Sequence, residues 1–396
     1  MSGLDIGWLT SSIGLSLTAK AFEFPDSLSA VTKLRQQYPE VEPDLIGQAI
    51  SQANLKAKAQ PNTPSNFLLT DDGLQQATRP SVAKFRSEFI LKKFGPQNIV
   101  DLTCGLGFDS YFLAKSGHNV TCIEKDPEIA SIASHNLNDL EIDLVCDDAN
   151  SFEIPSNTQM IFVDPARRDP TGPRNLFGQA KRILEPKDWS PSWDFIKQLA
   201  NDYRVIAKVA PGIKEEHIGN WDAYWISADG ELVETFLISG GSGIRSAVLL
   251  NRDQPRIIEG GKTTRTKALG NYLIVPNSAL IRASALNYLA EKYGAGLVND
   301  HIAWLTSEAL DVNLDKVAAQ FFKINSVEKL NEKSLAKLIA SMGAGSLTIM
   351  TRGVDLDLES LRKKILKSPT KGGPEVVIAI YRDDPGNVAL ICSRLT

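Results

Sequence analysis

The spacing of hydrophobic positions changes along the chain. Up to about residue 55, apolar side chains such as Leu34, Tyr38, Ile46 and Ile50 follow the spacing of short amphipathic helices. From residue 99, short runs rich in β-branched residues alternate with helical segments, which is typical of a parallel sheet with crossover helices. The pattern predicts an α/β fold with a Rossmann-like, seven-stranded sheet after an N-terminal helical region. The expected strands are 99–103, 119–124, 142–146, 160–164, 204–210, 223–227 and 245–250.

Polar segments separate these regions. Residues 56–66 contain two prolines, and residues 251–270 are polar with several glycines, so both read as linkers. Beyond them we expect a strand at 272–275, a helix at 278–292, a strand at 347–352, a helix near 358–366 and a strand pair at 375–382 and 387–394. The expected regions are a helical region and linker at 1–66, the sheet domain at 67–252, a linker with a small α/β region of ferredoxin-like type at 253–326, and a last α/β domain at 327–396.

Composition describes an ordinary globular protein. The chain has 396 residues, of which 43% are hydrophobic and 23% charged, enough for two or three domains. The sequence has no run of 18 apolar residues, so no membrane span is predicted. The N-terminus lacks the basic start of a signal peptide. The four cysteines lack CxxC spacing, so we expect neither a metal site nor disulfides, and a cytoplasmic location with reduced thiols.

Charge is distributed unevenly. The net charge of −4 argues against a protein that coats nucleic acid. Residues 251–396, however, hold 20 basic and 15 acidic side chains, whereas residues 1–250 hold 23 and 32. The C-terminal third is therefore the basic part of the chain.

The strongest chemical signal is the sequence DLTCGLGFD at residues 101–109, which leaves an expected strand and opens a helix. Gly105 and Gly107 let the backbone approach a ligand at the helix N-terminus. Asp101 precedes the first glycine by four residues, and Ser110 stands where a dinucleotide fingerprint has its third glycine. This departure disfavours NAD and favours S-adenosylmethionine. Further candidate contacts to the cofactor in the same loop are Thr103, Cys104 and Asp109.

Two more acidic residues follow expected strands. Glu124 lies 19 residues after Gly105, where a carboxylate can accept hydrogen bonds from both ribose hydroxyls of the cofactor. Asp148, followed by Ala149, could accept from the adenine amino group. The alternative interpretation, that these acids only cap helices, is stronger for Asp148. The cysteines near these strand ends are expected to be small buried packing residues: Cys104, Cys122 and Cys146.

The fourth expected strand ends in the sequence DPARR, which puts Asp164 at the sheet edge where open α/β folds bind ligands. Asp164 is the expected catalytic carboxylate, orienting a nucleophile or taking its proton. Arg167 and Arg168 could hold a substrate phosphate, or form a solvated surface turn. Lys208 ends the next strand and could bind substrate, act as a base or form an ion pair with Asp164.

Taken together, the segments DLTCGLGFD, CIEKDP, CDDA and VDPARR resemble the bacterial class I methyltransferases that carry a THUMP-like C-terminal domain. Residues 67–78 resemble the family's segment before the first strand, and TRGVD at 351–355 resembles its C-terminal signature. The resemblance thus runs from about residue 67 to the end. It implies S-adenosylmethionine as cofactor, bound at the matching Asp101, Gly105, Gly107, Glu124 and Asp148. RNA is the implied substrate class, because THUMP domains are associated with RNA-modifying enzymes.

The expected chemistry is in-line displacement at the sulfonium methyl, which needs alignment of the nucleophile and no metal. Enzymes that methylate exocyclic amines commonly have an aromatic residue after Asp-Pro-Pro, and this chain has Arg167 after Asp-Pro-Ala. The segment is closer to the DPPR of 5-methyluridine enzymes, but those need a cysteine nucleophile. The only cysteine after the fourth strand is Cys392, in the last expected strand, so the sequence favours non-covalent transfer.

Basic residues of the C-terminal domain are further candidates for substrate contacts. Arg352, Lys363 and Lys364 could bind RNA phosphates, or form a solvated helix face. Two other functions stay open: a methyltransferase that acts on a protein or small molecule, and an inactive methyltransferase fold that serves as an RNA-binding or assembly module.

Overall fold

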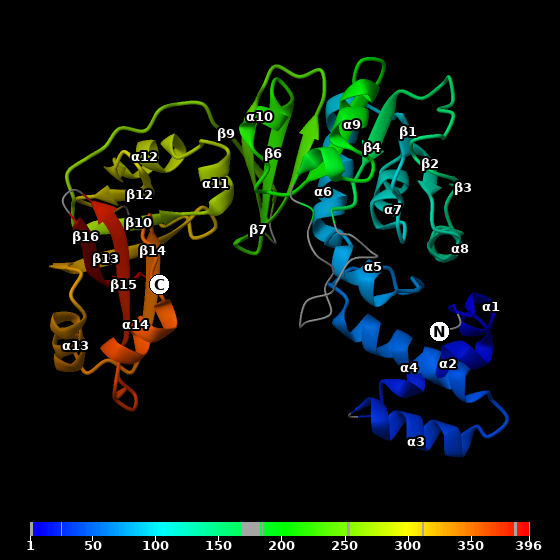
Figure 1. Ribbon diagram of the computed structural model, residues 1–396, viewed down its shortest axis with the longest axis horizontal. Coiled ribbons are helices and arrows are strands. Elements are labelled where there is room, and N and C mark those ends of the chain that lie inside the picture. The colour runs from blue at the N-terminus through cyan, green and yellow to red at the C-terminus, as the bar shows by residue number, and fades with distance from the viewer. Residues whose placement is uncertain are drawn as a thin grey trace. The chain divides into compact units, whose positions relative to one another are not determined.

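A computed structural model describes residues 3–24, 26–167, 183, 185–251, 254–310, 313–383 and 386–395 (Figure 1). Arg168, an expected substrate contact, lies outside these residues. Within the described ranges, no helix is long and apolar enough to cross a membrane.

The N-terminal region is helical, as predicted, with α1 (Ile6–Leu9), α2 (Ser12–Ala21), α3 (Ser27–Gln37) and α4 (Pro43–Lys58). Side chains cap the helix starts: Ser11 accepts from the Gly14 N–H and Asp26 from the Ser29 N–H. Pro43 opens α4, where its missing N–H costs nothing. The apolar positions that predicted these helices form their core, since Leu34 and Ile46 are fully buried.

This helical core continues into the domain that follows. Its buried cluster includes Leu106, Phe108 and Ile132, which belong to the glycine loop and the two helices after it. Asn136 makes the polar connection: its Oδ1 accepts from the Leu68 N–H at 2.7 Å, and its Nδ2 donates to the carbonyls of Leu68 and Leu106 at 3.1 and 3.0 Å. The helical region therefore supports the loop on which the site is built.

The first sheet confirms the predicted α/β class and has the strand order β3-β2-β1-β4-β5-β7-β6-β8-β9. Its strands are β1 (Asn98–Asp101), β2 (Asn119–Glu124), β3 (Ile142–Cys146), β4 (Met160–Val163), β5 (Arg204–Val209), β6 (Asp222–Ala228), β7 (Glu231–Ile238), β8 (Arg245–Leu250) and β9 (Arg256–Glu259). The helices between them are α5 (Asp71–Gln76), α6 (Pro80–Phe94), α7 (Phe108–Lys115), α8 (Pro127–Asn136), η1 (Pro186–Asp188), α9 (Trp193–Leu199) and α10 (Glu215–Ile218).

The sheet has two strands more than the seven predicted. β7 begins with Glu231 and includes Glu234 and Thr235, so it lacks a continuous apolar run, yet Glu234 and Thr235 are buried. β9 lies inside the segment expected to be a linker and pairs antiparallel with β8 at the sheet edge. One face of β9 is exposed, with Ile257 46% exposed, so its sequence carries little hydrophobic signal.

Strands β3, β2, β1, β4 and β5 are parallel neighbours. Asp101, the last residue of β1, is in register with Cys122 of β2 and Phe162 of β4. The loops after β1, β2 and β4 therefore leave from one edge of the sheet, where open α/β folds bind their ligands.

The second sheet has the order β11-β12-β10-β13-β16-β15-β14. Its strands are β10 (Tyr272–Pro276), β11 (Gly296–Asn299), β12 (Ile302–Ser307), β13 (Ala319–Lys329), β14 (Ser346–Arg352), β15 (Glu375–Asp383) and β16 (Gly386–Arg394), with helices α11 (Ser278–Arg282), α12 (Asn287–Tyr293), α13 (Glu332–Ser341) and α14 (Leu358–Ile365). The single helix expected at 278–292 is two helices, with Ser284 at φ +53° between them.

Two observations bear on the domain boundaries that the sequence predicts. The chain divides into two compact units, 1–222 with 236–242, and 223–235 with 243–396. The boundary expected between residues 326 and 327 falls inside β13, a strand of the second sheet. The division into four regions stays a prediction.

We expect Asn136→Ala to destabilise the first unit by roughly 2–4 kcal/mol, because it leaves one buried N–H and two carbonyls without their partner. Denaturation by urea, followed by circular dichroism, measures the change. The matched control is Asn201→Ala at an exposed position, where we expect a change below about 0.5 kcal/mol. Equal stability of the two variants would contradict the supporting role of Asn136.

Candidate active site

Asp101 ends β1 and is completely buried. Its Oδ2 accepts from the Ser110 hydroxyl at 2.6 Å, and its Oδ1 accepts from the Thr103 N–H at 3.0 Å. Burial, together with repulsion from Asp109 and Asp164, raises the pKa of Asp101 to about 7, although the two hydrogen bonds lower it. Asp101 thus connects Ser110 of α7 with Thr103 of the glycine loop.

The two glycines of the loop both have left-handed backbone conformations, with φ +54° at Gly105 and +86° at Gly107. A Cβ at Gly107 would lie 2.9 Å from the side chain of Leu137, so this glycine is required by packing. A Cβ at Gly105 would meet no atom of the described residues within 4 Å. Gly105 therefore faces open space at the sheet edge, which leaves room for a ligand against its backbone.

Glu124, at the end of β2, is held toward this space by two backbone donors. Its Oε2 accepts from the Gly105 N–H at 3.0 Å and its Oε1 from the Asp126 N–H at 2.9 Å. Each carboxylate oxygen has a second lone pair, so Glu124 can still accept hydrogen bonds from a diol.

Asp164 follows β4 at the same edge. Its backbone N–H donates to the Thr103 hydroxyl at 2.7 Å, and its side chain is 25% exposed. The next residues are held by backbone bonds: Ala166 pairs with Ser190 as an antiparallel bridge, and the Arg167 carbonyl accepts from the Ile183 N–H at 2.7 Å. The side chain of Arg167 is half-buried and has a contact of its own.

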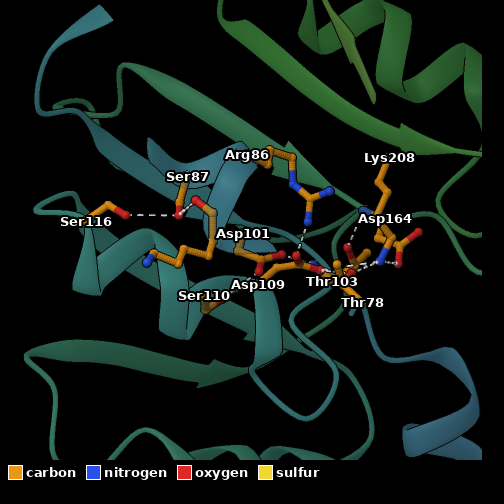
Figure 2. A network of polar contacts seen from close by, with 11 residues as sticks. Thr78, Arg86, Ser87, Asp101, Thr103, Asp109, Ser110, Ser116, Asp164 and Lys208 are labelled. Carbon is orange, nitrogen blue, oxygen red and sulfur yellow. Dashed lines mark hydrogen bonds and ion pairs between the residues drawn. The ribbon is translucent and has the colours of Figure 1, made fainter. Parts of the chain in front are cut away.

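Lys208 connects the acidic residues (Figure 2). From β5 its Nζ reaches Asp164 Oδ2 at 2.5 Å, the Thr78 hydroxyl at 2.6 Å and Asp109 Oδ2 at 3.4 Å, and its side chain is 7% exposed. Of the roles left open for Lys208, the ion pair with Asp164 is the one that the structure contains.

Asp109 was expected to contact the cofactor, but its carboxylate is occupied by the protein. It accepts from the Thr78 hydroxyl at 2.9 Å and forms ion pairs with Lys208 and with the buried guanidinium of Arg86. Burial would raise its pKa, but the charges of Arg86 and Lys208 outweigh this and hold the pKa below its usual range.

Thr78 and Arg86 were missed as functional residues. Thr78 lies just before α6, within the family-like segment 67–78, and Arg86 lies on α6. A signal for Arg86 was present, since it stands at a core position of a helix whose Val82 and Ile90 are fully buried. An arginine at such a position needs an anionic partner.

Asp148 and Ala149 follow β3 at the same sheet edge. Asp148 is exposed, and the Asn150 backbone and side chain donate to its Oδ1 at 2.8 and 2.7 Å, which lowers its pKa. These bonds hold a turn, and no helix lies between β3 and β4, so Asp148 does not cap a helix as the alternative interpretation supposed. Both bonds are made to Oδ1, so the Oδ2 atom of Asp148 accepts no hydrogen bond from the described residues.

The cysteines divide into buried and exposed. Cys104 and Cys122 are buried packing residues, as predicted, but Cys146 is exposed because β3 is the edge strand of the sheet. Cys392 is buried in β16, and burial raises the pKa of its thiol to about 12. A thiol with this pKa is a poor nucleophile at neutral pH, which agrees with non-covalent chemistry.

The expected C-terminal contacts lie in the second unit. Arg352 ends β14 and is exposed. Lys363 and Lys364 lie on α14 and, with Lys367, line a shallow cavity of about 410 Å³ that also has acidic residues, Asp357 and Glu359. Lys364 forms an exposed ion pair with Glu332 at 3.0 Å. Such a pair contributes little to stability, so Lys364 can leave it for a phosphate.

The strand order, the glycine loop after β1 and the acid at the end of β2 define a class I methyltransferase fold. A family model described as THUMP domain-like matches residues 319–394. An uncharacterized S-adenosylmethionine-dependent methyltransferase of Mycobacterium tuberculosis is 24% identical over 344 residues, covering 82% of this chain and 87% of that protein. The crystal structure of a candidate methyltransferase from Porphyromonas gingivalis W83 matches with a TM-score of 0.71 and 19% identity, over 96% of this chain and 98% of that one.

These findings agree with the resemblance carried by the sequence motifs. The chain is a class I S-adenosylmethionine-dependent methyltransferase with a THUMP-like C-terminal domain.

The raised pKa of Asp101 predicts a pH effect on stability. Between its ordinary value of 3.8 and about 7, the folded protein keeps a proton on Asp101 that the unfolded chain has lost. The contribution of this group to stability therefore falls as pH rises through the interval, by up to about 1.4 kcal/mol per pH unit. In Asp101→Asn, whose Oδ1 can still accept from Thr103 and whose amide N–H can donate to the Ser110 hydroxyl, this fall should disappear.

The measurement is the urea midpoint of wild type and Asp101→Asn from pH 4.5 to 7.5. Asp202→Asn, at an exposed position, is the matched control and should follow the wild type. If Asp101→Asn has the same pH dependence as the wild type, Asp101 is not protonated in the folded state.

Proposed function

We propose that this enzyme transfers the methyl group of S-adenosylmethionine to an RNA, either a tRNA or an rRNA, by non-covalent in-line displacement. The observation that carries the substrate class is the THUMP-like match at residues 319–394, since THUMP domains are associated with RNA-modifying enzymes. The basic charge of residues 251–396 supports it.

The cofactor is proposed to lie over the glycine loop. The open space at Gly105 leaves its backbone accessible, and the fixed carboxylate of Glu124 has lone pairs for the two ribose hydroxyls. Asp148 and Ala149 are proposed to meet the adenine. Asp101, Thr103, Cys104 and Gly107 shape the loop from behind, since their described contacts are with the protein itself.

We expect Gly105→Leu to abolish binding of S-adenosylmethionine, because the new side chain would occupy the space that the cofactor needs. The matched control is Gly117→Leu, since Gly117 also has a positive φ, of +98°, and open space around it, but lies in the turn after α7. The backbone strain in the control is at least as large, because a φ of +98° lies farther from the left-handed region that other residues can adopt. Isothermal titration calorimetry should show no heat for Gly105→Leu and wild-type affinity for Gly117→Leu; equal affinities would place the cofactor elsewhere.

When bound, the cofactor supplies an electrophilic methyl group on a sulfonium. Asp164 is the proposed catalytic residue: it follows β4 at the edge that carries the glycine loop, and its Oδ1 makes no hydrogen bond or ion pair within the described part of the chain. That oxygen can accept a hydrogen bond from the attacking N–H or O–H, align it and take its proton. Arg167 and Arg168, directly after it, are proposed to hold a substrate phosphate.

The THUMP-like domain is proposed to bind the RNA backbone. Arg352, Lys363 and Lys364 are exposed or partly exposed, and the cavity beside α14 combines lysines with the Ser360 side chain. Phosphate contacts of this kind make binding dependent on salt.

The test is methyl transfer from labelled S-adenosylmethionine to total RNA and, separately, to total protein, each isolated from cells that lack the enzyme. We expect label in the RNA. Asp164→Ala should lower the single-turnover rate roughly a hundredfold or more, because a positioned acceptor is lost, and should change RNA affinity far less.

The matched control for Asp164→Ala is Asp202→Ala, whose side chain is exposed on the turn before β5. Label in the protein fraction would favour a protein methyltransferase, and label in neither fraction despite cofactor binding would favour an RNA-binding module without turnover. Either result would refute the RNA methyltransferase.

A further inference from the structure

A buried polar network stands behind Asp164, and neither the family match nor the relatives assign it a role. It consists of Thr78, Arg86, Asp109 and Lys208 (Figure 2). Arg86 and Lys208 have side chains that are 1% and 7% exposed, so both charges are inside the protein. Asp164, at 25% exposed, is where this network reaches the sheet edge.

We propose that Lys208 and Thr78 are positioning residues that fix the carboxylate of Asp164 for methyl transfer, and that Asp109 acts through Lys208 without touching the cofactor. The proposal deepens the function proposed above and rests on it. It assigns Lys208 neither a base nor a substrate contact.

The described contacts engage the ammonium group of Lys208. Three oxygens lie within reach of its N–H donors, from Asp164 at 2.5 Å, Thr78 at 2.6 Å and Asp109 at 3.4 Å. A base would have to lose one of these protons, which would leave the carboxylates of Asp109 and Asp164 with less positive charge beside them. A substrate contact would have to replace one of the three oxygens.

The hydroxyl of Thr78 sets the direction of the hydrogen bonds in the network. It accepts from Lys208 and donates its one hydrogen to Asp109 at 2.9 Å. The hydroxyl thus connects the cation to the second carboxylate and sets where the ammonium group lies. Arg86 supplies the other counter-charge of Asp109, so Lys208 is not needed to neutralise Asp109 alone and can serve Asp164.

Asp164 is then fixed at both ends. Its backbone N–H is held by the Thr103 hydroxyl at 2.7 Å, and its Oδ2 by Lys208 at 2.5 Å. With these two contacts, the Oδ1 atom has a defined place from which to accept the nucleophile's proton. Catalysis by alignment depends on such fixed geometry.

The test compares Lys208→Met, Thr78→Val, Asp164→Ala and the double variant Lys208→Met/Asp164→Ala by single-turnover methyl transfer at saturating cofactor and acceptor. We expect Lys208→Met to slow transfer roughly tenfold to a hundredfold, and Thr78→Val, which keeps every charge, by less. The double variant should be no slower than Asp164→Ala alone, because Lys208 acts through Asp164. Affinity for S-adenosylmethionine, from calorimetry, should stay near the wild-type value.

Rescue by a conservative variant separates positioning from a merely structural role. Thr78→Ser keeps the hydroxyl between Lys208 and Asp109, so it should restore most of the rate that Thr78→Val loses. Lys197→Met, at a half-exposed lysine of α9, and Thr32→Val, at an exposed threonine of α3, are the matched controls and should leave the rate unchanged.

Three results would overturn the proposal: wild-type rates in both Lys208→Met and Thr78→Val, a double variant slower than Asp164→Ala by the full factor of Lys208→Met, or a Thr78→Ser variant as slow as Thr78→Val. If Lys208→Met does not fold, Thr78→Val decides alone, by a reduced or a wild-type rate. All rates are measured on the fraction, RNA or protein, that the wild type labels. Label in protein would refute the RNA substrate and still test the network, whereas no label in either fraction would refute both.

Discussion

Repulsion between three carboxylates is the constraint on which the site depends. Asp101, Asp109 and Asp164 come from the end of β1, the start of α7 and the end of β4, which meet because parallel strands bring their carboxyl ends to one edge. Among the described residues, two cations lie between them, Arg86 and Lys208. The third carboxylate, on Asp101, has its pKa raised to about 7, so near neutral pH it can hold a proton and relieve the imbalance.

The cations come from outside the glycine motif, and this explains why the chain before β1 belongs to the site. Arg86 lies on α6 and Thr78 just before it, while Gln52 of α4 exchanges two hydrogen bonds with the backbone of Leu69, at 2.8 and 3.0 Å. Asn136 then joins Leu68 to Leu106 of the glycine loop. The helical region, the segment that follows it and the loop thus form one packed support.

Local patterns predicted the part of the site that local sequence determines. Three site residues lie at or after the end of a strand whose apolar run is visible in the sequence: Gly105, Glu124 and Asp164. Their position at a common edge of the sheet could therefore be expected. The contacts of Lys208 could not be resolved in that way, because Thr78 lies 130 residues away in the chain and only the fold brings the two together. The protein partners of Asp109 could not be expected for the same reason: its place in the motif suggests the cofactor, whereas its ion pair is with Arg86, 23 residues earlier in the chain. Strands β7 and β9 were missed because buried polar residues in one and an exposed face in the other interrupt the hydrophobic pattern.

The gradient of exposure across the network indicates what kind of chemistry it supports. Arg86 and Lys208 are almost completely enclosed, and Asp109 is 12% exposed, so their charges are used within the protein. Only Asp164 extends to 25% exposure at the edge that carries Gly105 and Glu124. The network therefore presents an acceptor, and not a cation, toward the ligand space. An acceptor suits a nucleophile that must lose a proton as it attacks the methyl group, such as an N–H or O–H, whereas phosphate groups of a substrate would be repelled there and have to be bound by basic residues elsewhere.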